Sequence, residues 1–352
     1  MEKKLLIIST QLAGGCFHYS NEIISHWFSS YELVMPIKTE EKHNLKPDWT
    51  FQYYGVSKLS RMFSLFFTIL RVIFNAMMKK EYCGLLLFGT TKWDYIILKC
   101  WSITHLPSFS VIHDGKMHVG EQNKKNQKMI VGIMKKSTHL IFLSNYVHNL
   151  VKNNFSIDKP FFIAPHGLID YGPLPDVSSK TNRPTILFLG RVVKYKGVDL
   201  LLEAMRKVPD NLYDKLIIAG KWSYVNKSEY NHDKIEIIDK FLSQDEMLHY
   251  ISLSDVMIFP YIEATQSGVV TLAINYLRPS ISTEVGALKE QFSDDVTIFV
   301  KPDVDELSEA IKHLLQHPEL LEKMKNSLLK LRESYSWKKI AKDLNYKILA
   351  EC

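Results

Sequence analysis

Residues 185–279 decide the fold. This stretch opens with TILFLGRVVKYKG (185–197) and closes with DVMIFPYIEATQSGVVTLAINYLRP (255–279). At each end a short apolar run predicts a strand, a turn follows, and a second apolar run predicts a helix. Strands that alternate with helices are typical of a parallel sheet, which binds ligands beyond the carboxyl ends of its strands. We therefore expect both turns to lie at a ligand-binding edge.

The residues of the two turns suit a diphosphate. Arg191, after Gly190, offers a planar fork of donors and Lys196 a point charge, so together they can neutralise phosphate oxygens without a metal. The second turn predicts a helix that begins with Gln266, Ser267 and Gly268, with Thr265 as its N-cap. The amides and dipole of that helix would favour an anion. Each feature alone fits a surface charge or an ordinary helix start, and their combination favours a binding site.

These segments resemble a known family. GRVVKYKG (190–197) is similar to the G-R-x-x-x-x-K-G signature of the GT4-type retaining glycosyltransferases, which belong to the glycosyl transferases group 1 and have the GT-B fold. Residues 260–279 resemble the family's second signature, and the resemblance continues through ISTEVGALKEQF (281–292) and YSWKKIAKDL (335–344). It implies that Arg191 and Lys196 bind the diphosphate of a nucleotide sugar. It also implies that the loop amides contact the phosphates and the sugar; the donor-binding residues here are Gly190, Thr265, Gln266, Ser267, Gly268 and Val269.

The second signature departs from the common family pattern. Many members carry two glutamates eight residues apart, and the corresponding residues here are Ala264 and Leu272. A subset of the family has A-[ST]-Q-S-G-V at this place, as residues 264–269 do. Glu263, one position earlier, could substitute for the first glutamate as a catalytic group, or could equally be a solvated loop carboxylate.

Length and composition favour two globular domains. A chain of 352 residues, 46% hydrophobic and 23% charged, is too long for one ordinary core and is not disordered. The resemblance implies an α/β fold of two Rossmann-like domains whose parallel sheets face a cleft. We expect an acceptor domain at 1–175, a nucleotide-sugar donor domain at 176–335, and a C-terminal helix at 336–352 that crosses back to the first domain. The net charge of +6 is too small to indicate nucleic acid.

Polar residues also follow the predicted strands of the N-terminal half. Gly14 and Gly15 follow the first strand and would let a donor approach the backbone. The resemblance implies that this loop binds the donor and that His113, at the end of a later strand, contacts the donor sugar. Its neighbour Asp114, together with His118 and His166, is expected on the acceptor side. Ser144 is predicted to cap a helix.

Other residues of the C-terminal half are expected near the base or outside the site. Lys221, Phe241 and Leu242 lie in turns that should flank the base of a nucleotide, which is either UDP or GDP. Asp303 and Asp305 follow Pro302 at a predicted helix start, so we interpret them as carboxylates favoured by the helix dipole and not as a metal site. We expect neither a metal nor a cofactor.

Residues 57–80 predict an unusual helix. It is apolar on almost every side, and its charged residues are all basic. Such a helix can lie at a bilayer interface or can be buried against a sheet. Our hypothesis is that part of it, with Trp27, Phe28 and Lys58, touches a membrane or a lipid-linked acceptor.

The cellular location follows from other features. The four cysteines form no C-x-x-C pair, the first apolar run has only five residues, and no run reaches the ~20 residues that span a bilayer. We therefore expect a cytoplasmic protein that makes peripheral contact with the inner membrane face.

The resemblance, together with these features, implies a metal-independent hexosyltransferase. It would move a sugar, with retention, from a nucleotide sugar to a saccharide or lipid-linked saccharide in surface polysaccharide biosynthesis, such as that of lipopolysaccharide. Two alternatives remain open. One is a homologue that binds nucleotide sugars without transfer, because both usual glutamates are missing. The other is a different GT-B enzyme, an epimerase or a phosphorylase.

Overall fold

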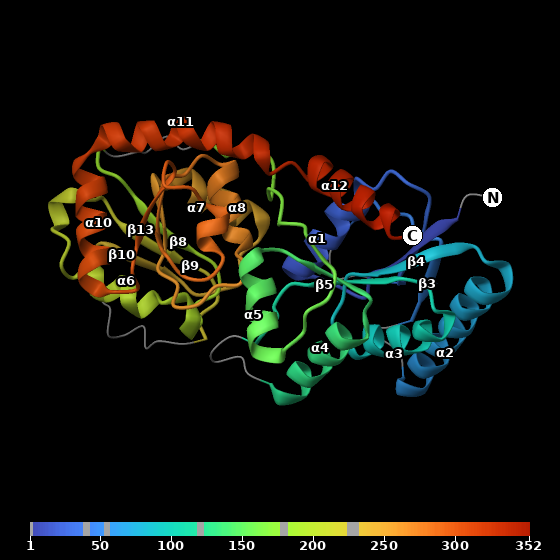
Figure 1. Cartoon of the computed structure of the whole chain (residues 1–352). Coiled ribbons are helices and arrows are strands. Elements are labelled where there is room, and N and C mark those ends of the chain that lie inside the picture. Colours follow the sequence, from blue (N-terminus) through green and yellow to red (C-terminus); the bar gives the residue numbers. More distant parts are fainter. Residues whose placement is uncertain (1–2, 38–42, 53–56, 118–122, 177–181, 224–231) are drawn as a thin grey trace. The chain divides into compact units, whose positions relative to one another are not determined.

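The computed structural model describes residues 3–37, 43–52, 57–117, 123–176, 182–223 and 232–352, without the side chains of Lys58 and Lys79. Contacts divide these residues into two compact units (Figure 1). The N-terminal unit comprises residues up to 117, residues 123–167 and residues 337–352, and the C-terminal unit comprises residues 168–336.

The N-terminal unit is built on a seven-stranded parallel sheet with the order β3-β2-β1-β4-β5-β6-β7. The strands are β1 Lys4–Ile8, β2 Tyr31–Pro36, β3 Trp49–Phe51, β4 Tyr82–Leu87, β5 Ser108–Ile112, β6 His139–Phe142 and β7 Phe161–Ile163. The main helices are α1 Gly14–Ser25, α2 Lys58–Phe74, α3 Lys92–Trp101, α4 Lys124–Lys136, α5 Asn145–Phe155 and α12 Trp337–Ala350. A π-helical turn, Asn75–Lys79, extends α2.

The C-terminal unit has a six-stranded parallel sheet with the order β10-β9-β8-β11-β12-β13. Its strands are β8 Ile186–Leu189, β9 Leu216–Ala219, β10 Ile235–Ile238, β11 Val256–Phe259, β12 Ser280–Thr283 and β13 Thr297–Val300. Its helices are α6 Val198–Met205, α7 Gln244–Leu253, α8 Gly268–Asn275, α9 Leu288–Gln291, α10 Val304–Gln316 and α11 Pro318–Ser334. Two parallel α/β sheets are the fold class that the sequence predicts.

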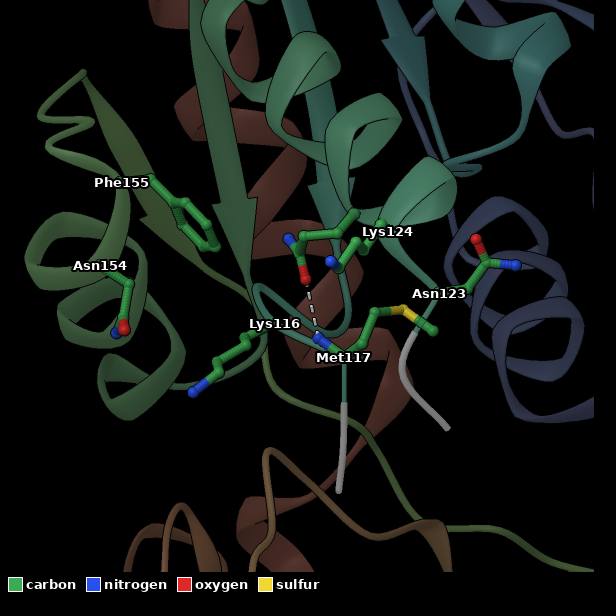
Figure 2. A pocket seen from close by; sticks show the side chains of 7 residues that line it. Lys116, Met117, Asn123, Lys124, Asn154 and Phe155 are labelled. Atoms are coloured by element: carbon green, nitrogen blue, oxygen red, sulfur yellow. Dashed lines mark hydrogen bonds between the residues drawn. The ribbon is translucent and has the colours of Figure 1, made fainter. Parts of the chain in front are cut away.

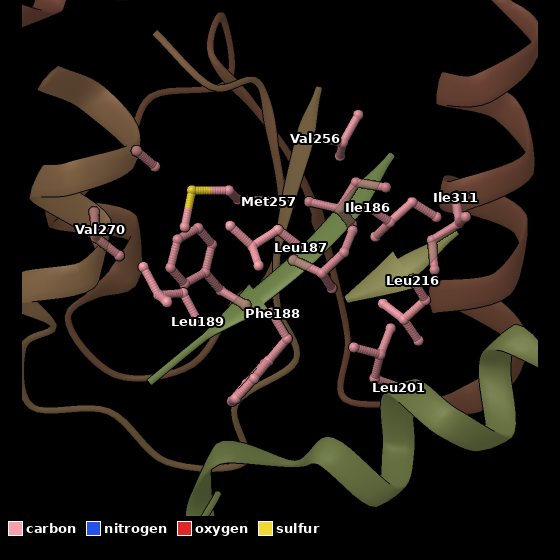
Figure 3. Close-up of a cluster of buried hydrophobic side chains, with 14 of the residues drawn as sticks. Ile186, Leu187, Phe188, Leu189, Leu201, Leu216, Val256, Met257, Val270 and Ile311 are labelled. Carbon is pink, nitrogen blue, oxygen red and sulfur yellow. The ribbon is translucent and has the colours of Figure 1, made fainter. Parts of the chain in front are cut away.

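The central strands are short and apolar throughout because helices cover both of their faces. Every residue of β8 is at most 2% exposed. Side chains of α6, α8 and α10, among them Leu201, Val270 and Ile311, close over β8 and its neighbours (Figure 3). Because β8 and β11 pair in parallel, the loops that follow them leave the sheet at one edge.

In each sheet the strand order reverses at the first strand of the unit, since β1 lies between β2 and β4, and β8 lies between β9 and β11. Open parallel sheets bind ligands beyond the carboxyl ends of the strands at such a reversal. The loop that enters α1 follows β1. Residues 190–197 follow β8 and residues 260–267 follow β11. The topology therefore brings the segments singled out by sequence to the binding edges of their own sheets.

Helix α12 packs against α1 in the N-terminal unit. Its first residue, Trp337, covers Gly167 so closely that a Cβ added to the glycine would lie 2.5 Å from the indole ring. Near its other end, the Asn345 amide donates to Ser29 Oγ at 2.9 Å. The chain thus returns to the unit in which it started.

Two predicted helix starts are confirmed. Ser144 caps α5 and accepts a hydrogen bond from the amide of Val147. Asp303 caps α10 and accepts from the amides of Asp305 and Glu306 at 2.8 and 3.1 Å. The Asp303 carboxylate is therefore engaged with the helix that it starts.

Candidate active site

The loop after β8 can be made only with glycine at its ends. Gly190 has φ +120° and Gly197 has φ +61°, both in the left-handed region. A Cβ on Gly197 would lie 1.9 Å from the carbonyl oxygen of Pro260. The loop after β8 is therefore pressed against the loop after β11, and the two signature segments form one structure.

Backbone hydrogen bonds hold the same two loops together. The carbonyl of Tyr195 accepts the amide of Ile262 at 2.7 Å and the amide of Glu263 at 3.3 Å. The Nζ of Lys196 lies 5.1 Å from the centroid of the Tyr261 ring, and a Cβ added to Gly190 would lie 3.0 Å from that Nζ. The ammonium group is thus positioned between the ends of β8 and β11.

A third segment supports the second loop from the other side. The amide of Ala287 donates to the carbonyl of Ala264 at 3.1 Å, beside Gly286 with φ +58°. The Gln291 side chain accepts from the amide of Ser267 at 2.9 Å and donates to the carbonyl of Ser267 at 3.1 Å. The loop that precedes α8 is therefore fixed in place before any ligand binds.

The predicted N-cap of the second signature is wrong. Helix α8 begins at Gly268 with Ser267 in the N-cap position, and Thr265 is buried with 1% exposure. The reason is the Gln291 amide, which holds the Ser267 backbone in an extended conformation with φ −134° and ψ 118°. The hydroxyl of Ser267 lies 3.2 Å from that of Tyr261 and does not cap the helix. The amino end of α8, where a helix favours an anion, is thus formed by Gly268 and Val269.

The positions of the usual signature glutamates are filled by apolar side chains. Ala264 and Leu272 are each 2% exposed. Glu263 is half-buried in the loop that Tyr195 holds. A carboxylate is thus retained one position before the usual place.

Gln266 is the residue of this loop whose polar atoms lack a partner among the described residues. Its Oε1 and Nε2 are both buried without a hydrogen bond. A buried carboxamide in that state destabilises the protein, and such an atom calls for an explanation. A bound polar ligand would explain this state, because it would accept a hydrogen bond from Nε2 and donate one to Oε1.

The expected base-binding residues are spread along the edge of β9 and β10. Lys221 pairs with Asp239 at 3.3 Å, and Asp239 also accepts the amide of Trp222 at 2.9 Å. Phe241 is 75% exposed and Leu242 is half-buried. Asp239, Tyr261 and Gln291 were not predicted from the sequence, although Tyr261 and Gln291 lie within the segments that carry the resemblance.

In the N-terminal unit, Gly14 and Gly15 begin α1 directly after β1's loop. Gly14 has φ +79°, and an added Cβ at either position would meet nothing within 4 Å. These two glycines therefore leave open space beside the backbone.

Histidines surround Tyr19 at this edge of the N-terminal sheet. The His113 ring lies edge-on to Tyr19 with 5.0 Å between centroids, and its buried Nε2 has no partner among the described residues. Burial lowers the pKa of His113 to about 4, against a smaller opposing effect of Asp114. The imidazole is neutral at neutral pH, so it can donate a hydrogen bond to a hydroxyl group or accept one from it.

His166 lies beneath the same cluster with 4% exposure. Its Nδ1 is 2.7 Å from the carbonyl of Gly167, and its ring stacks on that of His18 at 5.8 Å. Burial lowers its pKa to about 3. His18 was not predicted from the sequence, although it is one helical turn after Gly14 and hence on the same edge. Asp114 is half-buried beside the cluster, and His118 lies outside the described residues.

A cavity of about 250 Å³ lies near this edge (Figure 2). Lys116 and Met117 come from the segment after β5, Asn123 and Lys124 from the start of α4, and Phe155 from the end of α5. The side chain of Gln127 fixes its floor, since it accepts the amide of Met117 at 2.9 Å and donates to the carbonyl of Gly115 at 3.2 Å. Two lysines of its lining suit an anionic ligand, and this cavity was not predicted from the sequence.

Comparisons with known proteins find glycosyltransferases. Residues 175–330 match the family model described as "Glycosyl transferases group 1". Among curated proteins, the chain is 28% identical over 153 residues to alpha-D-kanosaminyltransferase of Streptomyces kanamyceticus, which is 41% of this chain and 39% of the relative. It is 27% identical over 184 residues to one of the subunits of phosphatidylinositol N-acetylglucosaminyltransferase from Arabidopsis thaliana, which is 47% and 38% of the two chains. The matched stretches span less than half the length of these relatives.

Solved structures share the fold over the whole length of the chain. Anabaena Alr3699/HepE in complex with UDP has a TM-score of 0.73 at 12% identity, and covers 99% of this chain and 100% of its own. Sucrose-phosphate synthase of Thermosynechococcus elongatus has a TM-score of 0.71 at 17% identity, with full coverage of both chains. At these identities the likeness shows the GT-B fold. Residues 175–330 are thus similar to the glycosyl transferases group 1, in agreement with the resemblance carried by the two signature segments.

Proposed function

We propose that the protein is a retaining, GT4-type hexosyltransferase that uses a nucleoside diphosphate sugar. The observation that carries the proposal is the position of Lys196, whose Nζ lies between Gly190 and the Tyr261 ring at the binding edge of the sheet. A fixed cation at this edge, next to the amino end of α8, provides positive charge where a diphosphate leaves. We assign UDP or GDP as the nucleoside diphosphate.

The reaction follows from this placement. The bond between the anomeric carbon and the diphosphate oxygen breaks, and its electron pair goes to that oxygen. Lys196 and Arg191 stabilise the developing negative charge, and the amides of Gly268 and Val269 add the positive end of the α8 dipole. An acceptor hydroxyl attacks the anomeric carbon on the same face, and its proton passes to the leaving diphosphate. No metal or cofactor takes part in this proposal.

The remaining site residues take positioning roles. The carboxamide of Gln266 pairs with a polar group of the donor, because both of its polar atoms are buried without a partner among the described residues. Glu263 takes the place of the first signature glutamate and binds sugar hydroxyls. His113, neutral at physiological pH, exchanges a hydrogen bond with the donor sugar.

We assign the acceptor to the N-terminal unit and propose a saccharide on a lipid carrier, used in surface polysaccharide biosynthesis at the cytoplasmic face of the membrane. The name of the Arabidopsis relative describes a transferase whose acceptor is phosphatidylinositol. Lys116 and Lys124 at the rim of the cavity in Figure 2 suit the phosphate of such a carrier. Asp114, His118 and His166 remain assigned to the acceptor side.

The proposal is tested by measuring release of nucleoside diphosphate from a panel of nucleotide sugars, with and without a bacterial lipid extract. We expect release with one donor, dependent on the extract, and a product with the anomeric configuration of the donor. Binding without release would instead support the homologue that does not transfer. Release that depends on inorganic phosphate would support a phosphorylase, and a changed sugar still attached to its nucleotide would support an epimerase.

A further inference from the structure

Helix α2 and the π-helical turn that extends it expose a continuous apolar face. Its main residues are 48–64% exposed: Leu59, Phe63, Phe66, Phe67, Leu70 and Phe74. The spacing of three and four residues places them along one side of the helix, and Met62, Met77 and Met78 continue the same side. We call this surface the α2 apolar face. Single exposed apolar residues are ordinary, whereas a continuous helix face of this kind indicates a docking surface.

The opposite side of the helix is already occupied. Val72 and Ala76 are 3% and 5% exposed, and Leu65 and Ile69 pack on the same core cluster of the N-terminal unit. The guanidinium of Arg71 lies 3.6 Å from the centroid of the Trp49 ring. The helix therefore cannot bury the α2 apolar face by turning over, because its other side would then lose these contacts.

The charge around this face selects its partner. Residues 57–80 contain five basic residues, Lys58, Arg61, Arg71, Lys79 and Lys80, and no acidic one. The basic residues lie mostly at the two ends of the helix. We propose that the α2 apolar face inserts into the interface of an anionic phospholipid bilayer, with the basic ends in contact with the lipid headgroups.

A second copy of the chain fits this face less well. A two-fold pair of antiparallel α2 helices would bring the Arg61 end of one helix to the Lys80 end of the other, and a parallel pair would bring like ends together. Either arrangement would place positive charges of the two copies close together, where they repel each other. An anionic lipid surface neutralises them instead.

The connectivity of the N-terminal sheet excludes that α2 spans the membrane. Leu59–Met78 is 20 residues long with a mean hydropathy of 1.4, so it is long and apolar enough to cross a bilayer, contrary to the expectation that no segment is. However, β3 before it and β4 after it belong to the same sheet, so both ends of the helix lie on one side of a membrane. The helix thus lies along the surface.

One part of the sequence hypothesis is wrong. Trp27 is 7% exposed, packs within the core of the N-terminal unit and donates from Nε1 to Ser29 Oγ at 3.1 Å. It is not available to a membrane. Phe28 is 52% exposed and contacts Tyr346, with 5.1 Å between their ring centroids.

The test is sedimentation of the full chain with vesicles of phosphatidylcholine alone and of phosphatidylcholine with phosphatidylglycerol. We expect binding to the anionic vesicles, weaker binding to the neutral ones, and release by high salt. The double variant Phe63→Gln/Phe67→Gln should bind about tenfold or more weakly. The control Leu329→Gln/Leu349→Gln, which removes apolar groups exposed elsewhere, should bind like wild type.

The thermal midpoint of each variant shows that it is folded, since all four side chains are at least 39% exposed. No binding of the folded wild-type protein to anionic vesicles would overturn the proposal. The proposal would also be overturned if the control variant lost binding equally, or if bound protein resisted both salt and alkaline extraction. A concentration-dependent dimer that the Phe63→Gln/Phe67→Gln variant abolishes would overturn it as well. These results do not depend on transferase activity, so they separate this inference from the proposed function.

Discussion

The Nζ of Lys196 lies 5.1 Å from the centroid of the Tyr261 ring, so the cation of the first signature segment rests against the start of the second loop. Gly197 and Pro260 make the same connection through the backbone. The charge is therefore held by two loops that follow adjacent strands, β8 and β11. A preorganised cation of this kind stabilises developing negative charge without rearrangement.

Replacing Lys196 with alanine should lower kcat/KM by roughly two to three orders of magnitude, or about 2.7 to 4 kcal/mol of transition-state stabilisation. The physical reason is loss of the cation that faces the leaving diphosphate. The measurement is steady-state kinetics with the donor identified in the panel. Lys194→Ala is the matched control, because Lys194 is an exposed lysine of the same loop. Equal losses in the two variants would contradict the assignment.

Gln266→Met should separate stability from binding. The substitution removes two buried polar atoms that have no hydrogen-bond partner among the described residues, so the free energy of unfolding of the free protein should stay the same or rise by about 1 kcal/mol. Affinity for the nucleotide sugar should fall about tenfold or more, because a hydrogen bond to the donor is lost. Denaturant unfolding and calorimetric titration measure the two quantities. Lower stability with unchanged affinity would show that Gln266 is structural.

The N-terminal unit should lose stability as the pH falls. Burial lowers the pKa of His113 to about 4 and of His166 to about 3 from the ordinary 6.5, so between pH 6.5 and 4 the unfolded chain binds protons that the folded chain does not. Unfolding therefore takes up protons in this range. The free energy of unfolding that these neutral histidines contribute is fully present above pH 6.5 and falls as the pH is lowered toward 4. The slope should be on the order of 1 kcal/mol per pH unit for each histidine.

Chemical denaturation from pH 7.5 down to about pH 4.5 measures this slope. The His166→Gln variant should show a slope that is smaller by the contribution of one histidine. The control His26→Gln, at an exposed position of the same unit, should keep the wild-type slope. A slope that is the same in wild type and His166→Gln would mean that His166 does not stay neutral in the folded unit.

Gly197→Ala should be strongly destabilising. The residue has φ +61°, and the new Cβ would lie 1.9 Å from the carbonyl oxygen of Pro260. Strain and displacement of the loop should together cost at least about 2 kcal/mol of unfolding free energy. Gly15→Ala is the control: its site at the start of α1 is open, so alanine should be accommodated without loss of stability. Thermal unfolding that fails to separate the two variants would contradict the loop geometry.

The strands and several helices could be predicted from sequence because each is a local pattern. The helix predicted after the first turn is α6, Val198–Met205, and the apolar run before Gly190 is β8. The start of α8 could not be predicted this way. It is set by Gln291, which binds the Ser267 backbone from 24 residues further along the chain.

Only part of the site could be predicted from the sequence. The glycines and cations of the loop after β8 are marked by their spacing, so they could be predicted from the sequence. Asp239, which pairs with Lys221, and His18, which stacks on His166, come from different elements, and their proximity depends on packing. Trp27 illustrates the same limit, since an aromatic residue beside an exposed Phe28 turned out to belong to the core.

The most direct test of the account is a thermal-shift series of wild type, Lys194→Ala and Lys196→Ala with UDP, GDP, ADP, their common sugars and NAD. A ligand at about 100 times its Kd stabilises the native state by about 2.7 kcal/mol, which raises the midpoint by several degrees. We predict a shift with one nucleoside diphosphate and its sugar that Lys194→Ala keeps and Lys196→Ala loses. A shift of equal size in all three proteins, or no shift with any nucleoside diphosphate, would contradict a diphosphate site at Lys196.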